Sequence, residues 1–171
     1  SSMRAAIITA AGRIKFQEAA SEIFRIFKDQ DQEVEVTQAA LQALHRLESA
    51  EVSKAVDLAL SDDRIALRED AQELLTELHL PENQLISMIT KILDNNTIPE
   101  KQKALASLST TTTSLGEQVL GKWLDELIKD QVHPALQLDV LTAVHNSAFD
   151  ELKGRKTVYE NSKDSTNILA A

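Results

Sequence analysis

The stretch LQLDVLTAV, residues 136–144, carries apolar side chains at positions 136, 140, 143 and 144. Steps of three and four residues place side chains on one face of a helix, so this stretch predicts a short amphipathic helix. The same pattern occurs four more times upstream in the chain. Because a pattern that recurs at a nearly fixed period is typical of repeat architectures, it predicts the fold of the whole chain.

Five segments of ten residues align on this pattern, and their starts are 33, 31, 33 and 36 residues apart. They begin at Met3, Val36, Leu67, Glu100 and Leu136. The eighth position is small in most segments and the ninth is apolar in all, so we expect both to be buried where two helices approach closely. From the first segment to the last, these positions hold Ala10 and Ala11, Ala43 and Leu44, Leu74 and Leu75, Ser107 and Leu108, and Ala143 and Val144.

A second helical stretch follows each aligned segment. We call the helix of the aligned segment the A helix and the helix that follows it the B helix. Apolar residues spaced by three and four positions predict the B helices rather than strands. These B helices are expected within residues 16–27, 52–60, 85–93, 115–128 and 149–158.

Residues that favour helix starts stand between the predicted helices. Pro81 and the pair His133–Pro134 precede helices, and proline is well tolerated in a first turn. Residues 97–100 (Thr-Ile-Pro-Glu) and 114–117 (Ser-Leu-Gly-Glu) have the form of capping boxes. Short polar residues that can cap an incoming A helix occupy 29–31, 61–63 and 94–96.

These observations predict an all-α fold, an α-α superhelix of about five helix pairs. Units about 33 residues long, each able to bury its apolar face only against its neighbours, are typical of helical solenoids. We expect one repeat domain over residues 1–160. Residues 161–171 are polar and lack periodicity, so we expect a tail or linker there.

The charge of the chain bears on its partners. The net charge is −9, and Lys and Arg are interspersed with acidic residues without forming a basic stripe, so no nucleic-acid partner is expected. Residues 48–100 hold twelve acidic against four basic side chains. This acidic middle could attract a basic partner, but a solvated helical face that aids solubility is the interpretation we prefer.

The composition excludes several kinds of site. The chain has no Cys, so it forms no internal disulfide, Cys-ligated zinc site, iron–sulfur cluster or Cys-linked haem. No apolar run approaches the roughly 18 residues that a membrane span needs, so direct membrane insertion is not expected. The sequence gives no candidate for catalytic, cofactor-binding or metal-binding residues.

One motif superficially matches a phosphate-binding loop. Residues 116–122, GEQVLGK, fit the G-x4-G-K pattern, but Trp123 follows where Ser or Thr should hold magnesium. No strand is predicted before it, and the segment lies inside a predicted amphipathic helix. We therefore expect a helix here and no phosphate site.

The remaining polar residues fit structural roles. His45 and His145 occupy the tenth position of their segments, where a His suits the C-terminal end of a helix, and His79 and His133 lie near segment ends. No histidine pair has the spacing of a helical zinc site. The carboxylates Asp62, Asp63, Glu69 and Asp70 are expected at loop corners and exposed helix faces, where they serve as caps and solvating groups.

Trp123 is the sole tryptophan of the chain. Its helical spacing with Leu120, Leu124 and Leu127 favours a place in the core. If Trp123 were partly exposed, it would be the first place to look for a partner contact.

The helix-pair period, with Arg4 and Arg68 at the second pattern position and Asp-rich turns between repeats, resembles HEAT repeats. The last third has a more specific likeness. Residues 121–127 (GKWLDEL) and 132–141 (VHPALQLDVL) resemble the HEAT segment of large bacterial membrane-associated dehydrogenase-like proteins. In that family, a β-propeller similar to quinone-dependent sugar dehydrogenases comes first, and a c-type cytochrome module follows the HEAT repeats. The resemblance covers about residues 1–160.

This resemblance implies a non-catalytic, cofactor-free spacer or interaction domain of a multidomain redox protein, located in the periplasm or otherwise outside the cytoplasm. Its partners would be neighbouring domains of the same polypeptide or another protein. The haem-binding Cys-x-x-Cys-His motif and the propeller are absent from this chain, so no catalytic or haem-binding residue carries over. An alternative is a free-standing adaptor that binds a protein or peptide on its concave surface. A third hypothesis, an enzyme similar to bilin-lyase-like repeat proteins, lacks a convergent polar cluster.

Overall fold

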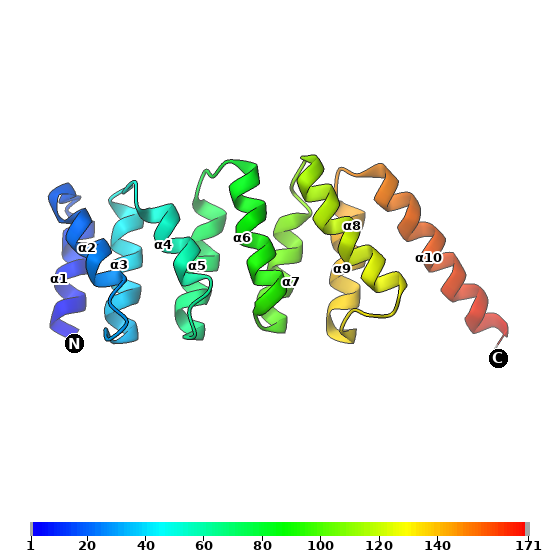
Figure 1. The fold of residues 1–171 in the computed structure, drawn as a ribbon, viewed down its shortest axis with the longest axis horizontal. Coiled ribbons are helices and arrows are strands. Elements are labelled where there is room, and N and C mark those ends of the chain that lie inside the picture. The colour runs from blue at the N-terminus through cyan, green and yellow to red at the C-terminus, as the bar shows by residue number, and fades with distance from the viewer. Residues whose placement is uncertain (1, 170–171) are drawn as a thin grey trace. The chain divides into compact units, whose positions relative to one another are not determined.

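The predicted all-α class is confirmed. The computed structural model describes the backbone of residues 2–169 and the side chains of residues 3–163. Over residues 2–169 it contains ten α-helices, one short 3₁₀ helix and no strand (Figure 1). Each of the five predicted A helices and five predicted B helices is present.

The chain divides into two compact units, Ser1–Leu80 and Pro81–Ala171. The boundary falls inside the third predicted helix pair, between its A helix and its B helix. The expectation of one repeat domain over residues 1–160 stays a prediction. The first unit holds α1 (Ser2–Arg13), the 3₁₀ helix (Gln17–Ala19), α2 (Ala20–Phe27), α3 (Val34–Arg46), α4 (Val52–Ala59) and α5 (Ile65–Glu77); the second holds α6 (Glu82–Asn95), α7 (Ile98–Leu108), α8 (Ser114–Ile128), α9 (Pro134–Asn146) and α10 (Asp150–Leu169).

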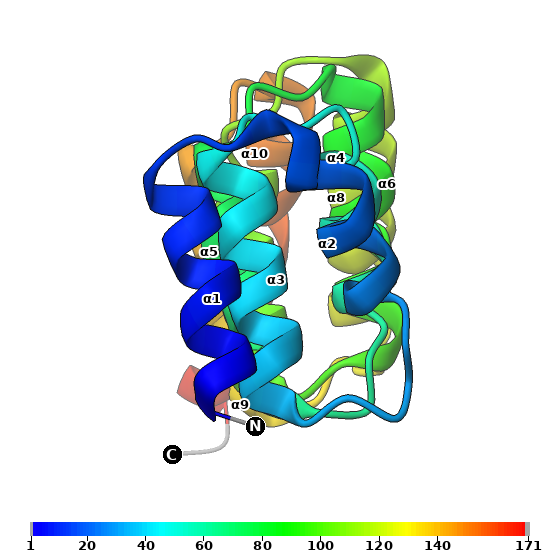
Figure 2. The same cartoon turned by 90° about the vertical axis from the view of Figure 1, so that its left-hand side faces the viewer.

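In the first unit, the A helices form one layer and the B helices another. Helix α3 packs against both α1 and α5, α2 packs on α3, and α4 packs on α3 and α5. Figure 2 shows α1 and α3 side by side, with α2 and α4 on the other side of the unit. The fully buried Leu41 and Leu44 of α3 lie in the core between these layers. Burial of such side chains contributes about 1.5–3 kcal/mol each.

The second unit is built in the same way. Its A helices α7 and α9 pack against each other, and the B helices α6, α8 and α10 contact them and pack in series. The core is formed by fully buried apolar side chains from both layers, among them Ile89, Leu105, Leu124 and Val140.

The predicted burial of the eighth and ninth positions is confirmed in α3, α5 and α9. In α7, Leu108 is buried and Ser107 is half-buried. In α1 the prediction is wrong, because Ala10 is exposed while Ile8 and Gly12 are buried. The register of the first segment therefore starts at Arg4, one residue later than predicted.

Close packing between α1 and α3 fixes this register. A Cβ atom added to Gly12 would lie 2.9 Å from the Cα of Ala43, a distance that side chains do not tolerate. Gly12 thus occupies the ninth position because α3 leaves no room for a side chain there. Ile8 takes the fifth position, and only 4% of it is exposed.

The helix starts agree only in part with the sequence. The capping box of Thr97 and Glu100 is confirmed, with the Glu100 carboxylate accepting the Thr97 backbone N–H at 2.9 Å. The second capping box is wrong, because Thr113 rather than Ser114 caps α8. Glu82 of α6 accepts backbone N–H groups of Thr112 and Thr113 at 2.5 and 2.9 Å. These bonds hold the loop so that the cap of α8 lies one residue before the predicted Ser114.

The polar turns do not cap the incoming helices in the expected way. Helices α3 and α5 follow Glu33 and Arg64, neither of which caps its helix through its side chain. Instead, Asp29 accepts the backbone N–H of Asp31, and Asp62 accepts that of Arg64. These aspartates therefore stabilise the turns between helices and do not cap the first turn of the helix that follows.

Helix α10 extends into the predicted tail. It continues to Leu169, so residues 161–169 are helical, while Ala170 and Ala171 lie outside the described residues. A role of this segment as a linker stays a prediction. Among the described helices, none combines the length and the apolar character needed to cross a membrane.

Candidate protein-binding site

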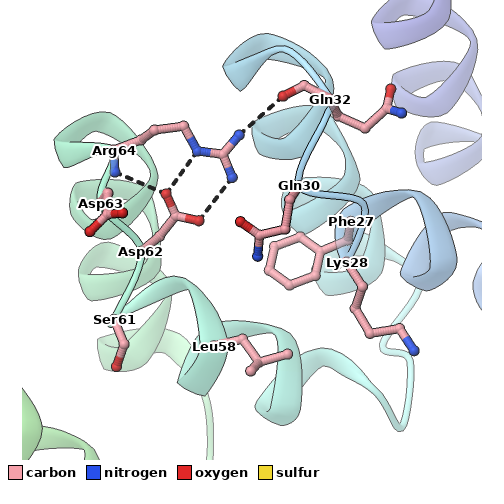
Figure 3. A pocket seen from close by; sticks show the side chains of 9 residues that line it. All are labelled: Phe27, Lys28, Gln30, Gln32, Leu58, Ser61, Asp62, Asp63 and Arg64. Atoms are coloured by element: carbon pink, nitrogen blue, oxygen red, sulfur yellow. Dashed lines mark hydrogen bonds and ion pairs between the residues drawn. The ribbon is translucent and has the colours of Figure 1, made fainter.

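An open pocket of ≈ 740 Å³ lies in the first unit, between the loop that follows α2 and the segment that joins α4 to α5 (Figure 3). It combines apolar, amide and charged side chains. The lining residues are Phe27, Lys28, Gln30, Gln32, Leu58, Ser61, Asp62, Asp63 and Arg64.

Side-chain contacts hold the first wall of the pocket, residues 29–32. Asp29 accepts the backbone N–H of Asp31 at 3.1 Å and the side-chain amide of Gln32 at 2.5 Å. Arg4 of α1 donates to the side-chain oxygen of Gln32 at 2.9 Å. The loop is therefore fixed both by its own turn and by the neighbouring A helix.

Arg64 joins this loop to the second wall. Its guanidinium binds Asp62 in a bidentate manner, through Nε at 2.7 Å and Nη2 at 2.8 Å. Its Nη1 donates to the backbone oxygen of Gln32 and to the hydroxyl of Thr37, both at 3.2 Å. Figure 3 shows the bonds of this clamp from Arg64 to Asp62 and to Gln32 across the top of the pocket. Bidentate arginine–carboxylate pairs fix geometry as well as charge, so the two loops are held at a defined separation.

The clamp also sets the charge state of its members. The hydrogen bonds from the Arg64 side chain hold the pKa of Asp62 below its ordinary value, and Asp62 in turn raises the pKa of Arg64. Asp62 is therefore ionised at neutral pH and is unsuited to act as a general acid. Its role in the pocket is to position Arg64.

Several groups remain for a partner to contact. Leu58 projects from α4 with 47% of its surface exposed, beside the buried ring of Phe27. Gln30 lies between the Asp62–Arg64 pair and the Phe27 ring in Figure 3, and its side-chain amide makes no hydrogen bond within the described part of the chain. Lys28 sits over the ring of Phe24 at 4.7 Å, and Asp63 is exposed. An apolar contact point in the same pocket as an unengaged amide suits recognition of a polypeptide.

A second groove, of ≈ 640 Å³, lies between α8 and α10 in the second unit. Its charged side chains largely pair with each other: Arg155 binds Asp125, and Lys122 lies 3.9 Å from Glu126. Apart from Gly121, Leu152 is the only apolar residue among the described residues that line this groove. It is the weaker candidate because such paired surface charges contribute little to binding.

The phosphate-loop motif lies within α8, as expected from the sequence. Its two glycines, Gly116 and Gly121, are buried. A Cβ atom on Gly116 would come within 2.8 Å of the Cβ of Thr111, and one on Gly121 would come within 3.4 Å of Leu152. These glycines therefore serve helix packing, and the helical backbone between them has its amides engaged.

The histidines and carboxylates singled out in the sequence are dispersed. His45 lies 3.0 Å from Glu77, and His133 caps α9 by accepting the backbone N–H of Ala135. His145 lies in the last turn of α9, and His79 is an exposed loop residue. Over the residues whose side chains are described, no three His, Asp or Glu gather as metal ligands would.

The four carboxylates singled out in the sequence are also dispersed. Asp62 and Asp63 line the pocket, Asp70 accepts a hydrogen bond from Gln38 at 2.8 Å, and Glu69 is exposed on α5. Trp123 is half-buried at the edge of the core, next to the fully buried Leu120 and Leu124. It does not line the pocket.

The sequence did not predict Leu58 as a site residue. The buried face of α4 is formed by Val52, Ala55, Val56 and Ala59, and Leu58 lies off this face. An apolar residue that breaks the period of an otherwise amphipathic helix is the signal that could have identified it.

Comparisons with known proteins add no assignment. No family model matches this chain, and no curated protein matches its sequence.

Proposed function

We propose that this chain is a non-catalytic helical-repeat scaffold that binds a protein or peptide partner in the pocket between residues 27–32 and 58–64. The observation that carries the proposal is the exposed Leu58, which lines the same pocket as the unengaged amide of Gln30 and the Asp62–Arg64 clamp.

The energetics favour a polypeptide partner. Covering the half-exposed Leu58 with an apolar side chain would contribute on the order of 1 kcal/mol, and a hydrogen bond to Gln30 about 0.5–1.5 kcal/mol. The walls are already held by Arg64, Asp62 and Asp29, so binding orders few further side chains. A partner segment presenting one apolar residue beside backbone amide groups meets both requirements.

A non-catalytic role is favoured by the chemistry of the pocket. Asp62 is ionised and bound to Arg64, and four N–H groups of Arg64 are engaged by protein acceptors. Neither group is left to transfer a proton or to stabilise a developing charge.

The resemblance to the HEAT segment of dehydrogenase-like proteins extends this proposal. In that setting the scaffold would hold a catalytic propeller and a cytochrome module in register outside the cytoplasm, or dock a partner of that assembly. The complete coding sequence tests this extension. A propeller encoded upstream and a Cys-x-x-Cys-His motif downstream would support it, whereas a gene encoding only these residues would favour the free-standing adaptor.

Peptide selection tests the pocket itself. A phage-displayed library of random peptides is selected on the immobilised chain, and enriched peptides are measured by fluorescence anisotropy. Leu58→Glu should weaken their binding about tenfold or more, because a charge replaces the apolar contact. Gln30→Ala should weaken it about two- to tenfold through loss of one hydrogen bond.

Val158→Glu is the matched control, because Val158 is an equally apolar, exposed residue of α10 in the other unit. It should leave peptide binding unchanged. Peptides that bind wild type and Leu58→Glu with equal affinity, or a library that yields no binder, would overturn the assignment of this pocket.

A further inference from the structure

One pair of A helices in each unit, α3 with α5 and α7 with α9, meets at the same register. Counting from Arg4, Val36, Leu67, Glu100 and Leu136, the third residue of one A helix donates to the fourth residue of the next. Gln38 of α3 donates to Asp70 of α5 at 2.8 Å, and Gln102 of α7 donates to Asp139 of α9 at 3.0 Å. These contacts lie in different units but occupy the same positions.

A second contact extends the pattern. His45, at the tenth position of α3, lies 3.0 Å from Glu77 at the eleventh position of α5. Two contacts in the same order along both helices require that α3 and α5 run parallel. We call the side of an A helix with the third and tenth positions its forward face, and the side with the fourth and eleventh positions its backward face.

The backward face of α1 is apolar and uncovered. Ile7, at the fourth position, and Ile14, at the eleventh position directly after the end of α1, are 64% and 75% exposed. Met3 and Ala10 continue the same stripe and are also exposed. A groove of ≈ 410 Å³ borders this stripe and is lined by Ala6, Thr9, Ala10, Arg13 and Ile14. The equivalent positions of α5 hold Asp70 and Glu77, which α3 contacts.

The forward face of α9 is also apolar at the position that matters. Leu138, at the third position, is 73% exposed, and His145 at the tenth position is exposed as well. The equivalents of Leu138 are Gln38 and Gln102, which reach the next A helix. Isolated exposed leucines need no explanation, but this one stands at a contact position of the repeat.

We propose that the forward face of α9 in one copy of this chain packs against the backward face of α1 in a second copy. Leu138 then meets Ile7 at the register where Gln38 meets Asp70 and Gln102 meets Asp139. The apolar pair replaces a hydrogen-bonded pair, so the contact gains its stability from burial rather than from a buried polar group.

A second copy is the occupant that this chain favours. Leu138 and Ile7 stand at the two positions that form the Gln38–Asp70 and Gln102–Asp139 contacts, and both lie on the same chain. Such a contact is heterologous, since two different faces meet. A symmetric pairing of two α1 helices is disfavoured by charge. Residues 1–17 contain Arg4, Arg13 and Lys15 and no acidic residue, so this arrangement would bring like charges together.

Sedimentation velocity tests the proposal with the full chain at concentrations up to about 1 mM, where even weak contacts are populated. The weight-average sedimentation coefficient of the wild type should rise with concentration. Ile7→Glu and Leu138→Glu should each abolish this rise, while Val158→Glu should retain it. Both target side chains are exposed, so folding should be unchanged; Ile7→Gln and Leu138→Gln replace them if circular dichroism shows otherwise.

Mixing the two variants makes the test specific. The Ile7→Glu chain keeps an intact α9 face and the Leu138→Glu chain keeps an intact α1 face, so an equimolar mixture should form dimers and no larger species. A wild type that stays monomeric at about 1 mM would overturn the proposal. Undiminished self-association of Leu138→Glu, or a mixture that stays monomeric, would overturn it as well.

Discussion

Gln38 donates its side-chain amide to the carboxylate of Asp70, 32 residues further along the chain, at 2.8 Å. In the second unit, Gln102 and Asp139 form the same pair at 3.0 Å. The pair marks a register at which one A helix meets the next. The fold is thus held by a repeated polar contact in addition to the buried apolar residues.

This contact should be measurable as a coupling free energy. Gln38→Ala, Asp70→Ala and the double variant form a cycle in which the pair should contribute about 0.5–1.5 kcal/mol to the free energy of unfolding. Urea unfolding followed by circular dichroism gives the four values. Gln38→Ala combined with Asp139→Ala is the control, because these residues are not partners and their effects should add. Additive effects for Gln38 and Asp70 as well would show that the hydrogen bond does not stabilise the unit.

Gly116 should tolerate no larger residue. In Gly116→Ala, the new methyl group would lie 2.8 Å from the Cβ of Thr111, which is itself only 2% exposed. Overpacking of this kind should lower the free energy of unfolding by about 1–3 kcal/mol.

Gly154→Ala provides the matched control in α10. Beyond its chain neighbours and the backbone of its own helix, no atom lies within 4 Å of the position that its methyl group would take. Because alanine favours helix over glycine, this variant should be stabilised by about 0.5–1 kcal/mol. Thermal unfolding of both variants checks the pair of predictions. Equal effects of the two substitutions would contradict the packing of α8 on the Thr111 loop.

Glu82 should make stability depend on pH. The backbone N–H groups of Thr113 and Thr112 bind its carboxylate and hold its pKa below the ordinary value of 4.5. A lowered pKa in the folded state means that the contribution is fully present above the ordinary value. It is lost as the pH falls through the folded value.

Glu82→Gln removes this titration. Between about pH 6 and about pH 3, the wild type should lose more stability than Glu82→Gln, measured by urea unfolding across the range. Glu69→Gln, which removes an exposed carboxylate of α5, should follow the wild type. Parallel curves for wild type and Glu82→Gln would exclude a contribution of the Glu82 contact.

Periodicity predicted the core of α3, α5 and α9 because most of their apolar residues lie on one face, although Ile65 of α5 and Leu138 of α9 are exposed. It failed in α1, where Ile7 and Ile8 are adjacent and both apolar, so the sequence offers two registers. The contact of Gly12 with Ala43 decides between them, and it becomes visible only in three dimensions. The same comparison of registers identifies the exposed Ile7 and Leu138 as residues at positions where other A helices contact each other.

The start of α8 and the pocket show a different limit. Thr113 and Ser114 are adjacent hydroxyl residues, and the choice between them depends on Glu82, which lies 31 residues before Thr113. The pocket depends on the hydrogen bonds from Arg64 to Gln32 in the loop before α3 and to Thr37 in α3. Such long-range contacts leave no mark in local spacing, although Leu58 can be recognised as an apolar residue outside its helical face.

The central claim is that a polypeptide partner binds between residues 27–32 and 58–64. Amide hydrogen exchange tests it most directly. Exchange is measured by mass spectrometry on the chain alone and on the chain saturated with a selected peptide. Exchange should slow in these two segments and stay unchanged in the groove between α8 and α10. Slowing confined to that second groove, or no slowing in either place, would contradict the account.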